Sequence, residues 1–325
     1  MHTDTLSEVL QAVRLRGAVF FDVEASAPWV AEAPPARIIA PAVMPGAGHV
    51  IEYHVLTGGT CWAAIAGEPE RVQLVAGDVV AFPQGDAHII SSAPGMRGEL
   101  DMSVFDAPAA GIRLPLVMNL DGGGAEQAQL ICGFLGCDAR PFNPLLQSLP
   151  RLLHVPRAPG EAGAADAFIR MALAETREQR IGAVGMLSRL GELMFAELVR
   201  RHLEHLPQDS GGWLAGLRDR HVGRALALLH AEPQRDWSLE QLGREAGLSR
   251  SAFAARFTGF VGLAPMQYLK RWRLQLAATQ LADGAESIAA IGTRAGYESE
   301  AAFSRAFRNA VGVPPGEWRR QSRPA

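Results

Sequence analysis

The chain has 325 residues, of which 48% are hydrophobic and 20% are charged. This length exceeds that of one typical domain, and the composition is that of a globular protein with substantial cores, so we expect two domains. No run of eighteen or more apolar residues occurs, which excludes a conventional membrane-spanning helix. The N-terminus lacks the basic-then-apolar pattern of a secretory signal, and the three cysteines are too few for a disulfide framework. We therefore expect a cytoplasmic protein.

The formal net charge of −3 is unevenly distributed along the chain. From Trp237 to the C-terminus, basic residues exceed acidic residues by five, so the rest of the chain has a net charge of −8. A basic C-terminal module on an acidic body suggests that this module alone binds a polyanion.

The first half of the chain has the sequence pattern of a β-rich domain. After a short amphipathic helix expected at residues 4–15, short apolar runs alternate with Gly, Pro and Asp from about Gly17 to about Pro156. Many short strands separated by turn signals predict a β-sandwich or barrel. The predicted strands are residues 18–23, 37–44, 49–56, 60–66, 71–83, 88–93, 113–120 and 130–137.

A helical segment follows, from Ala164 to Leu206, and the stretch 207–212 is a plausible linker. We therefore divide the chain into a sensor domain (1–160), a helical linker or dimerisation segment (161–212) and a DNA-binding domain (213–325). An apolar stripe in the linker either forms the seam of a homodimer, which we expect, or packs against the barrel. It comprises Leu187, Leu190, Met194 and Leu198.

Two similar segments with a helical sequence pattern occur near the C-terminus, at Leu242–Phe257 and at Ile291–Phe307. Each copy follows a serine at a helix N-cap position, has a glycine where one helix ends and the next begins, and places two phenylalanines four residues apart on one helix face. These features are typical of a helix-turn-helix, although a pair of αα-hairpins would show similar spacing. The duplication, in the only basic part of the chain, favours DNA binding. The paired positions are Ser238 and Ser287, Gly247 and Gly296, Phe253 and Phe303, and Phe257 and Phe307.

From about Val222 to Arg320 the sequence resembles the AraC family of bacterial transcription regulators. The resemblance implies two helix-turn-helices bridged by a long helix, here about 265–281, with double-stranded DNA and RNA polymerase as partners. We expect an activator of transcription, with a repressor as the alternative. The diagnostic residues are Ile288, Ala289, Gly296, Tyr297, Phe303, Arg305, Phe307, Gly312, Pro315 and Arg319.

If the phenylalanines face inward, the opposite face of each second helix faces the DNA. Arg305 occupies the family's usual arginine position, so it is the best candidate for a guanine contact, with a phosphate contact or a plain surface charge as alternatives. The matching position in the first copy is Ala255, which predicts that the second copy supplies most of the polar specificity. The outward positions are Arg250, Ser251, Ala254, Ala255 and Thr258 in the first copy, and Ser299, Glu300, Ala301, Ser304, Arg305 and Arg308 in the second; Arg271, Arg273, Arg319 and Arg320 are candidate phosphate contacts or surface charges.

The string Gly77–His88 resembles the second motif of the cupin superfamily, and Glu52–Gly59 lies where the first motif should be. Strand alternation places Glu52 and His54 on one face and His49 on the other, so Glu52, His54 and His88 could converge inside a barrel. Such a set could hold a transition metal, or the barrel could have lost its metal and now hold an effector. A cupin-type metalloenzyme, a dioxygenase or isomerase, is the alternative to a regulator. No convincing nucleophile or acid–base pair supports it.

Two cysteines, Cys132 and Cys137, lie in one predicted strand. Their spacing of five residues places them on opposite faces, so they are either buried thiols or parts of a redox sensor. Together these features predict a two-domain α+β protein with an N-terminal cupin-type β-barrel, a helical linker and a C-terminal all-α double helix-turn-helix. We expect a homodimeric transcription regulator that is controlled by a small effector or by a redox or metal signal.

Overall fold

The computed structural model describes residues 4–106, 114–157, 164–178 and 180–322. The chain divides into two compact units. The sheet unit contains Leu15–Cys137 and Leu149–Glu204, whereas the helical unit contains the chain up to Arg14, the segment Asp138–Ser148, and the chain from His205. In the described part of the chain, no helix is long and apolar enough to cross a membrane.

The sheet unit is built around nine strands in the order β2-β6-β3-β8-β1-β7, with β4 and β5 also paired to β3 and β9 paired to β5. All of these pairs are antiparallel except β1 with β7. The strands are β1 (Arg16–Ser26), β2 (Val30–Ala33), β3 (His49–Ile65), β4 (Val72–Val75), β5 (Val79–Phe82), β6 (His88–Ser91), β7 (Leu116–Asp121), β8 (Gln127–Cys137) and β9 (Leu153–Val155).

Strand β3 combines two of the predicted strands and lets the sheet curl. Its first half pairs with β5 on one side and β8 on the other, while its second half pairs with β4 and β6. A register shift between Leu56 and Gly58 marks the change of partners. Gly59 has a φ of 77°, and a Cβ at this position would lie 1.9 Å from the carbonyl oxygen of Gln127, so only glycine fits.

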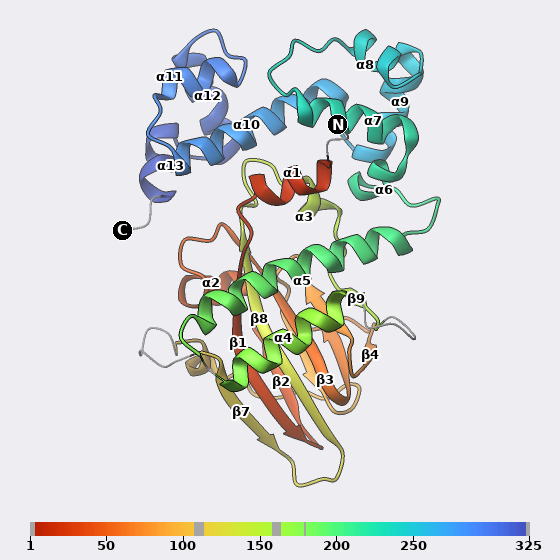
Figure 1. The fold of residues 1–325 in the computed structure, drawn as a ribbon, viewed down its shortest axis with the longest axis vertical. Coiled ribbons are helices and arrows are strands. Elements are labelled where there is room, and N and C mark those ends of the chain that lie inside the picture. Colours follow the sequence, from red (N-terminus) through yellow and green to blue (C-terminus); the bar gives the residue numbers. More distant parts are fainter. Residues whose placement is uncertain (1–3, 107–113, 158–163, 179, 323–325) are drawn as a thin grey trace. The chain divides into compact units, whose positions relative to one another are not determined.

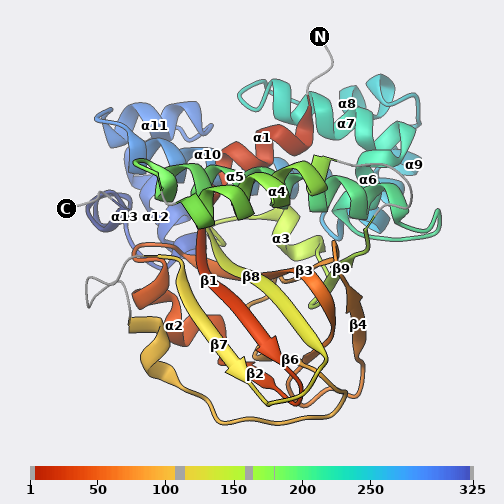
Figure 2. The same cartoon turned by 60° about the horizontal axis from the view of Figure 1, so that its bottom comes forward.

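Two helices, α4 (Ala164–Glu178) and α5 (Ala183–His205), cover one face of this sheet, as Figures 1 and 2 show. The predicted continuous helix is thus interrupted, and Gly182 has a φ of 90° at the break. The predicted linker stripe from Leu187 to Leu198 is buried. Leu190 and Met194 lie beside Tyr53 of β3, so the stripe packs on the sheet of its own chain.

One predicted strand is wrong. Residues 37–44 were expected to be extended, but α2 (Ala36–Val43) is a helix that precedes β3. Ala36, Ile39 and Val43 are its buried residues, a helical spacing rather than the alternation of a strand, and burial of this face determines the helix despite Pro41.

The helical unit contains two helix-turn-helices, as predicted. The first is formed by α8 and α9 and the second by α11 and α12, and α10 connects them (Figure 1). Gly247 and Gly296 lie in the two turns with φ of 74° and 84°. The helices are α1 (Thr5–Ala12), α3 (Pro144–Ser148), α6 (Trp213–Arg218), α7 (Arg220–Ala231), α8 (Leu239–Glu245), α9 (Arg250–Val261), α10 (Pro265–Asp283), α11 (Ile288–Arg294), α12 (Glu300–Val311) and α13 (Pro315–Ser322).

The predicted serines cap these helices. Ser238 and Gln241 form a reciprocal capping box at α8, and the Ser287 side chain accepts a hydrogen bond from the backbone N–H of Ala290 at α11. The predicted phenylalanine pairs are fully buried, with ring centroids 5.7 Å apart in α9 and 5.6 Å apart in α12. Each helix-turn-helix is therefore held by its own apolar core and by its own caps.

Helix α10 also binds two segments from the N-terminal half of the chain. The fully buried side chain of Gln275 accepts a hydrogen bond from the backbone N–H of Phe142 (3.0 Å) and donates one to the carbonyl oxygen of Ala12 (3.0 Å). Thr279 donates a second hydrogen bond to Ala12 (2.8 Å). The guanidinium of Arg14 forms a salt bridge with Asp138 (2.8 Å), which joins the two segments to each other.

We predict that Gln275→Leu lowers the free energy of unfolding by about 1–3 kcal/mol, because it leaves the buried N–H of Phe142 without an acceptor. Urea denaturation of the full chain measures this change. Gln11→Leu, at an exposed position of α1, is the control and should change stability by less than about 1 kcal/mol. Equal losses in the two variants would contradict the role of Gln275.

Candidate nucleic-acid interface and buried cavity

The outward face of α9 is poor in charged groups. Arg250, Ser251, Ala255 and Thr258 are exposed, whereas Ala254 is half-buried. Arg250 forms no salt bridge with any residue that the structure describes, so its charge is available to a ligand. The rest of this face offers one hydroxyl at each end and methyl groups between them.

The outward face of α12 has more donors. Arg305 and Arg308 are exposed and, within the described parts of the chain, form no salt bridge; Glu300 is exposed and Ser304 is half-buried. Ser299 is the N-cap, and its hydroxyl oxygen accepts a hydrogen bond from the N–H of Ala302 (3.2 Å). Two unpaired guanidinium groups, one turn apart, thus project from the second helix.

Other arginines of this unit stabilise its structure. Arg256 forms a bidentate pair with Asp219, the N-cap of α7, and this pair lowers the pKa of Asp219 to about 2. Arg273 donates to the carbonyl oxygens of Pro233 (2.5 Å) and Arg235 (2.9 Å). Arg319 likewise donates to the carbonyl oxygen of Glu286, and Arg294 forms a salt bridge with the Glu286 carboxylate. Of the candidate phosphate contacts, Arg273 and Arg319 therefore already hold the protein's own backbone, whereas Arg271 and Arg320 are exposed.

The sheet unit contains a partly open cavity of about 250 Å³. Its walls come from β1, β2, β3, β6, β7 and β8 and are mainly apolar, and its lining includes all three residues of the predicted cluster. The aromatic walls were not predicted from the sequence, although strand alternation alone could have placed Phe21 and Val23 on one face. The lining residues used below are Phe21, Trp29, Glu32, Glu52, His54, His88, Glu99, Asp101, Phe105, Cys132 and Phe134.

The structure brings Glu52, His54 and His88 together, as alternation predicted. The Nε2 atoms of His54 and His88 are 2.7 Å apart, and Nε2 of His88 lies 3.9 Å from Oε2 of Glu52. Burial lowers the pKa of His54 and lowers that of His88 to about 4, while it raises the pKa of Glu52 to about 8. All three side chains are therefore uncharged at neutral pH. His49 lies on the opposite face, where its Nε2 contacts the carbonyl oxygen of Pro83 (2.7 Å).

The hydrogen bonds define the tautomers of both histidines. Nδ1 of His88 lies 3.0 Å from the carbonyl oxygen of Asp86, which can only accept, so Nδ1 carries the proton. Nε2 of His88 then accepts from Nε2 of His54, and Nδ1 of His54 has no proton. This Nδ1 and Oε1 of Glu52 are both buried and have no hydrogen-bond partner.

The cluster does not fit a metal ion. The Nε2 lone pair of His88 already accepts a hydrogen bond from Nε2 of His54, so the two imidazoles bind each other. Among the residues that the structure describes, no three His, Cys, Asp or Glu side chains are arranged to bind a metal. The polar end of the cavity is better suited to hydrogen-bonding a small molecule.

The two cysteines proposed as redox residues, Cys132 and Cys137, are buried in β8, and Cys132 lines the cavity. Burial raises the pKa of the Cys132 thiol well above its ordinary value. Burial likewise raises the pKa of Cys61 to about 12. Cys132 and Cys61 are thus protonated thiols at neutral pH, which lowers their reactivity towards oxidants.

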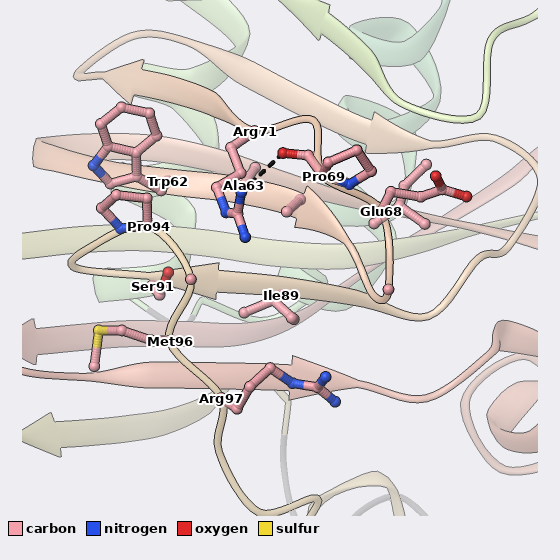
Figure 3. A pocket seen from close by; sticks show the side chains of 14 residues that line it. Trp62, Ala63, Glu68, Pro69, Arg71, Ile89, Ser91, Pro94, Met96 and Arg97 are labelled. Atoms are coloured by element: carbon pink, nitrogen blue, oxygen red, sulfur yellow. Dashed lines mark hydrogen bonds between the residues drawn. The ribbon is translucent and has the colours of Figure 1, made fainter.

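A second hollow, of about 310 Å³, lies beside β3 and β6 and is shown in Figure 3. Arg71 and Arg97 are exposed there, and Arg71 donates a hydrogen bond to the carbonyl oxygen of Pro69 (2.8 Å). None of its described lining residues has a buried polar atom without a partner. Although it is larger, this hollow lacks the unpaired polar groups of the first cavity.

Comparison with known proteins supports both halves of this architecture. A family model described as Cupin matches residues 4–204, and one described as Helix-turn-helix domain matches residues 242–321. A putative AraC-like transcription regulator from Streptomyces lividans is 31% identical over 98% of both chains. The chain belongs to the AraC family of transcription regulators.

Two further relatives agree with this assignment. Another putative AraC-like regulator, from Streptomyces antibioticus, is 30% identical over 99% of this chain and all of its own length. The RCS-specific transcriptional activator RclR of Escherichia coli is 29% identical over 86% of this chain and 88% of its own. The predicted family, the fold class and the function as a DNA-binding transcription regulator are thus confirmed.

We predict that Glu52 makes this regulator less stable as the pH rises. The folded-state pKa of Glu52, about 8, lies above its ordinary value of 4.5, so its stabilising contribution is complete below pH 4.5 and is lost as the pH rises to about 8. The lowered pKa of His88 acts in the opposite direction, but only between about pH 4 and 6.5. From pH 7 to 8, the wild type should therefore lose about 1 kcal/mol of unfolding free energy relative to Glu52→Gln.

Urea denaturation at the two pH values tests this prediction. Glu24→Gln, at an exposed position of β1, is the matched control and should follow the wild type. Identical pH dependence in all three proteins would show that Glu52 is ionised in the folded state.

Proposed function

We propose that α9 and α12 bind neighbouring major-groove segments of one DNA duplex. Helix α10, with 19 residues, connects the two helix-turn-helices. Their outward arginines form no salt bridge in the described chain, and this observation supports the proposal most directly. These arginines are Arg250, Arg305 and Arg308. A helix of this length spans about 28 Å at ~1.5 Å per residue. That approaches the ~34 Å between successive major-groove faces, and modest DNA bending supplies the remainder.

We further propose that the two recognition helices contribute unequally. Arg305 forms a bidentate contact with guanine, while Arg308, Ser304 and Glu300 lie on the same face of α12. On α9, Arg250 anchors the backbone, and the methyl groups of Ala254, Ala255 and Thr258 contact thymine methyls. Ser251 and Ser299 lie at the first turns of their helices, where hydroxyl and backbone donors face phosphates.

We propose that a small molecule bound in the 250 Å³ cavity controls DNA binding. Strands β1 and β8 line this cavity, and the chain continues directly from them to Arg14 and Asp138. Those residues belong to the two segments that Gln275 of α10 binds. A ligand that favours one arrangement of β1 and β8 would thereby change the population of DNA-binding states. Oxidation of Cys132 or Cys137 remains a separate hypothesis, which mass spectrometry after mild oxidation tests.

The proposal assigns the cavity a binding role rather than a catalytic one, in a cytoplasmic regulator. Relatives named as regulators support this, and the name of RclR supports activation through RNA polymerase. Turnover of an oxygen-reactive substrate by metal-loaded protein would instead establish the metalloenzyme alternative.

A homodimer is part of the proposal. The stripe from Leu187 to Leu198 packs on its own sheet, but Met186 and Leu193 of α5 are 48% and 51% exposed and lie seven residues apart. We expect Leu193→Glu to shift the protein toward monomer in analytical ultracentrifugation. Val117→Glu, at an exposed position of β7, should leave the oligomeric state unchanged. A wild-type protein that is monomeric at high micromolar concentration contradicts the dimer.

For DNA binding, we predict that Arg305→Ala costs about 1–3 kcal/mol on the preferred site and relaxes selection at one base position. Fluorescence anisotropy of the full chain, with duplex DNA from the region beside its own reading frame, measures both effects. Arg37→Ala, an exposed arginine of α2 in the sheet unit, is the charge-matched control.

Equal weakening of Arg305→Ala on all sequences would identify a phosphate contact instead of a base contact. Failure of the wild-type chain to bind any duplex below micromolar concentration at low salt would contradict the proposed function itself.

A further inference from the structure

The cavity of the sheet unit has the walls of a site for an apolar ligand. Phe21, Trp29, Phe105 and Phe134 line it, and the ring centroid of Phe105 lies 5.9 Å from that of Phe21 and 6.4 Å from that of Phe134. A cavity of about 150 Å³ is known to bind benzene. The 250 Å³ here therefore accommodates an aromatic ring with a short substituent, or an alkyl chain of similar volume.

The polar end of the cavity holds two polar atoms that have no hydrogen-bond partner. The side chain of Glu52 is only 3% exposed, and its Oε1 atom has no partner. Nδ1 of His54 also has no partner, and the hydrogen bond from His54 to His88 makes this atom an acceptor. Leaving two such acceptors unpaired is costly, so a ligand that supplies donors to both gains the corresponding free energy.

The charges around the cavity have one sign. Three carboxylates, Glu32, Glu99 and Asp101, line it beside the protonated Glu52, and no described lining residue is a lysine or an arginine. Glu32 is compensated by a bidentate contact with Arg97 (2.6 and 3.1 Å). Glu99 and Asp101 are exposed and form no salt bridge within the described ranges. This arrangement attracts cations and repels anions at the cavity.

We propose that the effector is a lipophilic primary amine whose ammonium group binds between Glu52 and His54 and whose apolar body lies against the four aromatic rings. This proposal rests on the proposed function of the cavity as the effector site. An ammonium group has three N–H donors, so it pairs with Nδ1 of His54 and with the Glu52 carboxyl, which loses its proton on binding, and leaves one donor for a further group. It also favours the ionised form of Glu52, and the aromatic faces add cation–π attraction.

Other ligand classes match these groups less well. An alcohol has no charge, so it cannot form the ion pair with Glu52 that an ammonium group forms. A carboxylate brings no donor and meets Glu99 and Asp101 at the cavity with no cation in the described lining to neutralise it. The remaining titratable groups that face Glu52 are His54 on β3, His88 on β6 and Cys132 on β8, and all are uncharged at neutral pH.

Three probes of the same shape test the assignment on the full chain: 2-phenylethylamine, 2-phenylethanol and phenylacetate. Isothermal titration calorimetry at pH 7 should show that the amine binds at least about tenfold more tightly than the alcohol, because hydrogen bonds between charged groups are the stronger ones. Phenylacetate should not bind. Equal affinity for amine and alcohol, tighter binding of phenylacetate, or no binding of any probe overturns the proposal.

Two variants locate the ammonium site. Glu52→Gln should weaken amine binding by about tenfold or more and leave alcohol binding within about threefold, which also shows that the cavity is intact. Glu24→Gln, on the exposed side of β1, should bind the amine like the wild type. An amine affinity that survives Glu52→Gln overturns the assignment.

Measuring DNA affinity in the same samples separates this proposal from the proposed function. A protein that binds specific DNA but shows no preference for the amine disproves only the ligand class. A protein that binds the amine through Glu52 without any change in DNA affinity disproves control by the cavity, and the amine site stands.

Discussion

A single buried amide joins three distant segments of this regulator. Gln275 of α10 is fully buried, and it hydrogen-bonds to Phe142 on one side and to Ala12 on the other. A polar group at such a position is stable only when both its donor and its acceptor are paired, so the bond to each segment depends on the presence of the other. Arg14 and Asp138 then join the two segments directly. The helical unit is consequently not a free-standing C-terminal domain, because its central helix is complete only with residues from the N-terminal half.

The arginines of the helical unit divide by their partners. Three arginines are paired within the fold. Arg256 binds the N-cap Asp219, Arg273 binds two backbone carbonyl groups, and Arg294 binds a carboxylate in a loop. The guanidinium groups on the outward faces of α9 and α12 have no such partner in the described chain. Proximity to the recognition helix is therefore insufficient to identify a base-contacting arginine: Arg256 lies in α9 itself, yet it is bound to Asp219.

Much of the helical unit could be predicted because its signals are local. Caps such as Ser238, turn glycines such as Gly247 and phenylalanines four residues apart each determine structure within a few residues. Alternation similarly placed Glu52 and His54 on one face of a strand. Features that depend on distant partners could not be predicted. The helix α2 depends on burial of Ile39, and the register shift in β3 depends on which strands pair with each half of it. No sequence pattern indicated that Phe142 and Ala12 meet at Gln275.

Burial of polar groups gives the cavity its binding properties and also lowers the stability of the sheet unit. Desolvation keeps Glu52 protonated and His88 neutral, and Oε1 of Glu52 and Nδ1 of His54 have no hydrogen-bond partner, which lowers the stability of the sheet unit. A ligand that supplies donors removes that penalty and therefore binds with a free energy that the apolar walls alone would not provide. Because β1 and β8 both line this cavity and continue directly into the segments that Gln275 binds, we propose that a ligand acts on α10 through these two strands. A fully satisfied core would be more stable, but it would have no comparable free energy with which a small molecule could shift the regulator between states.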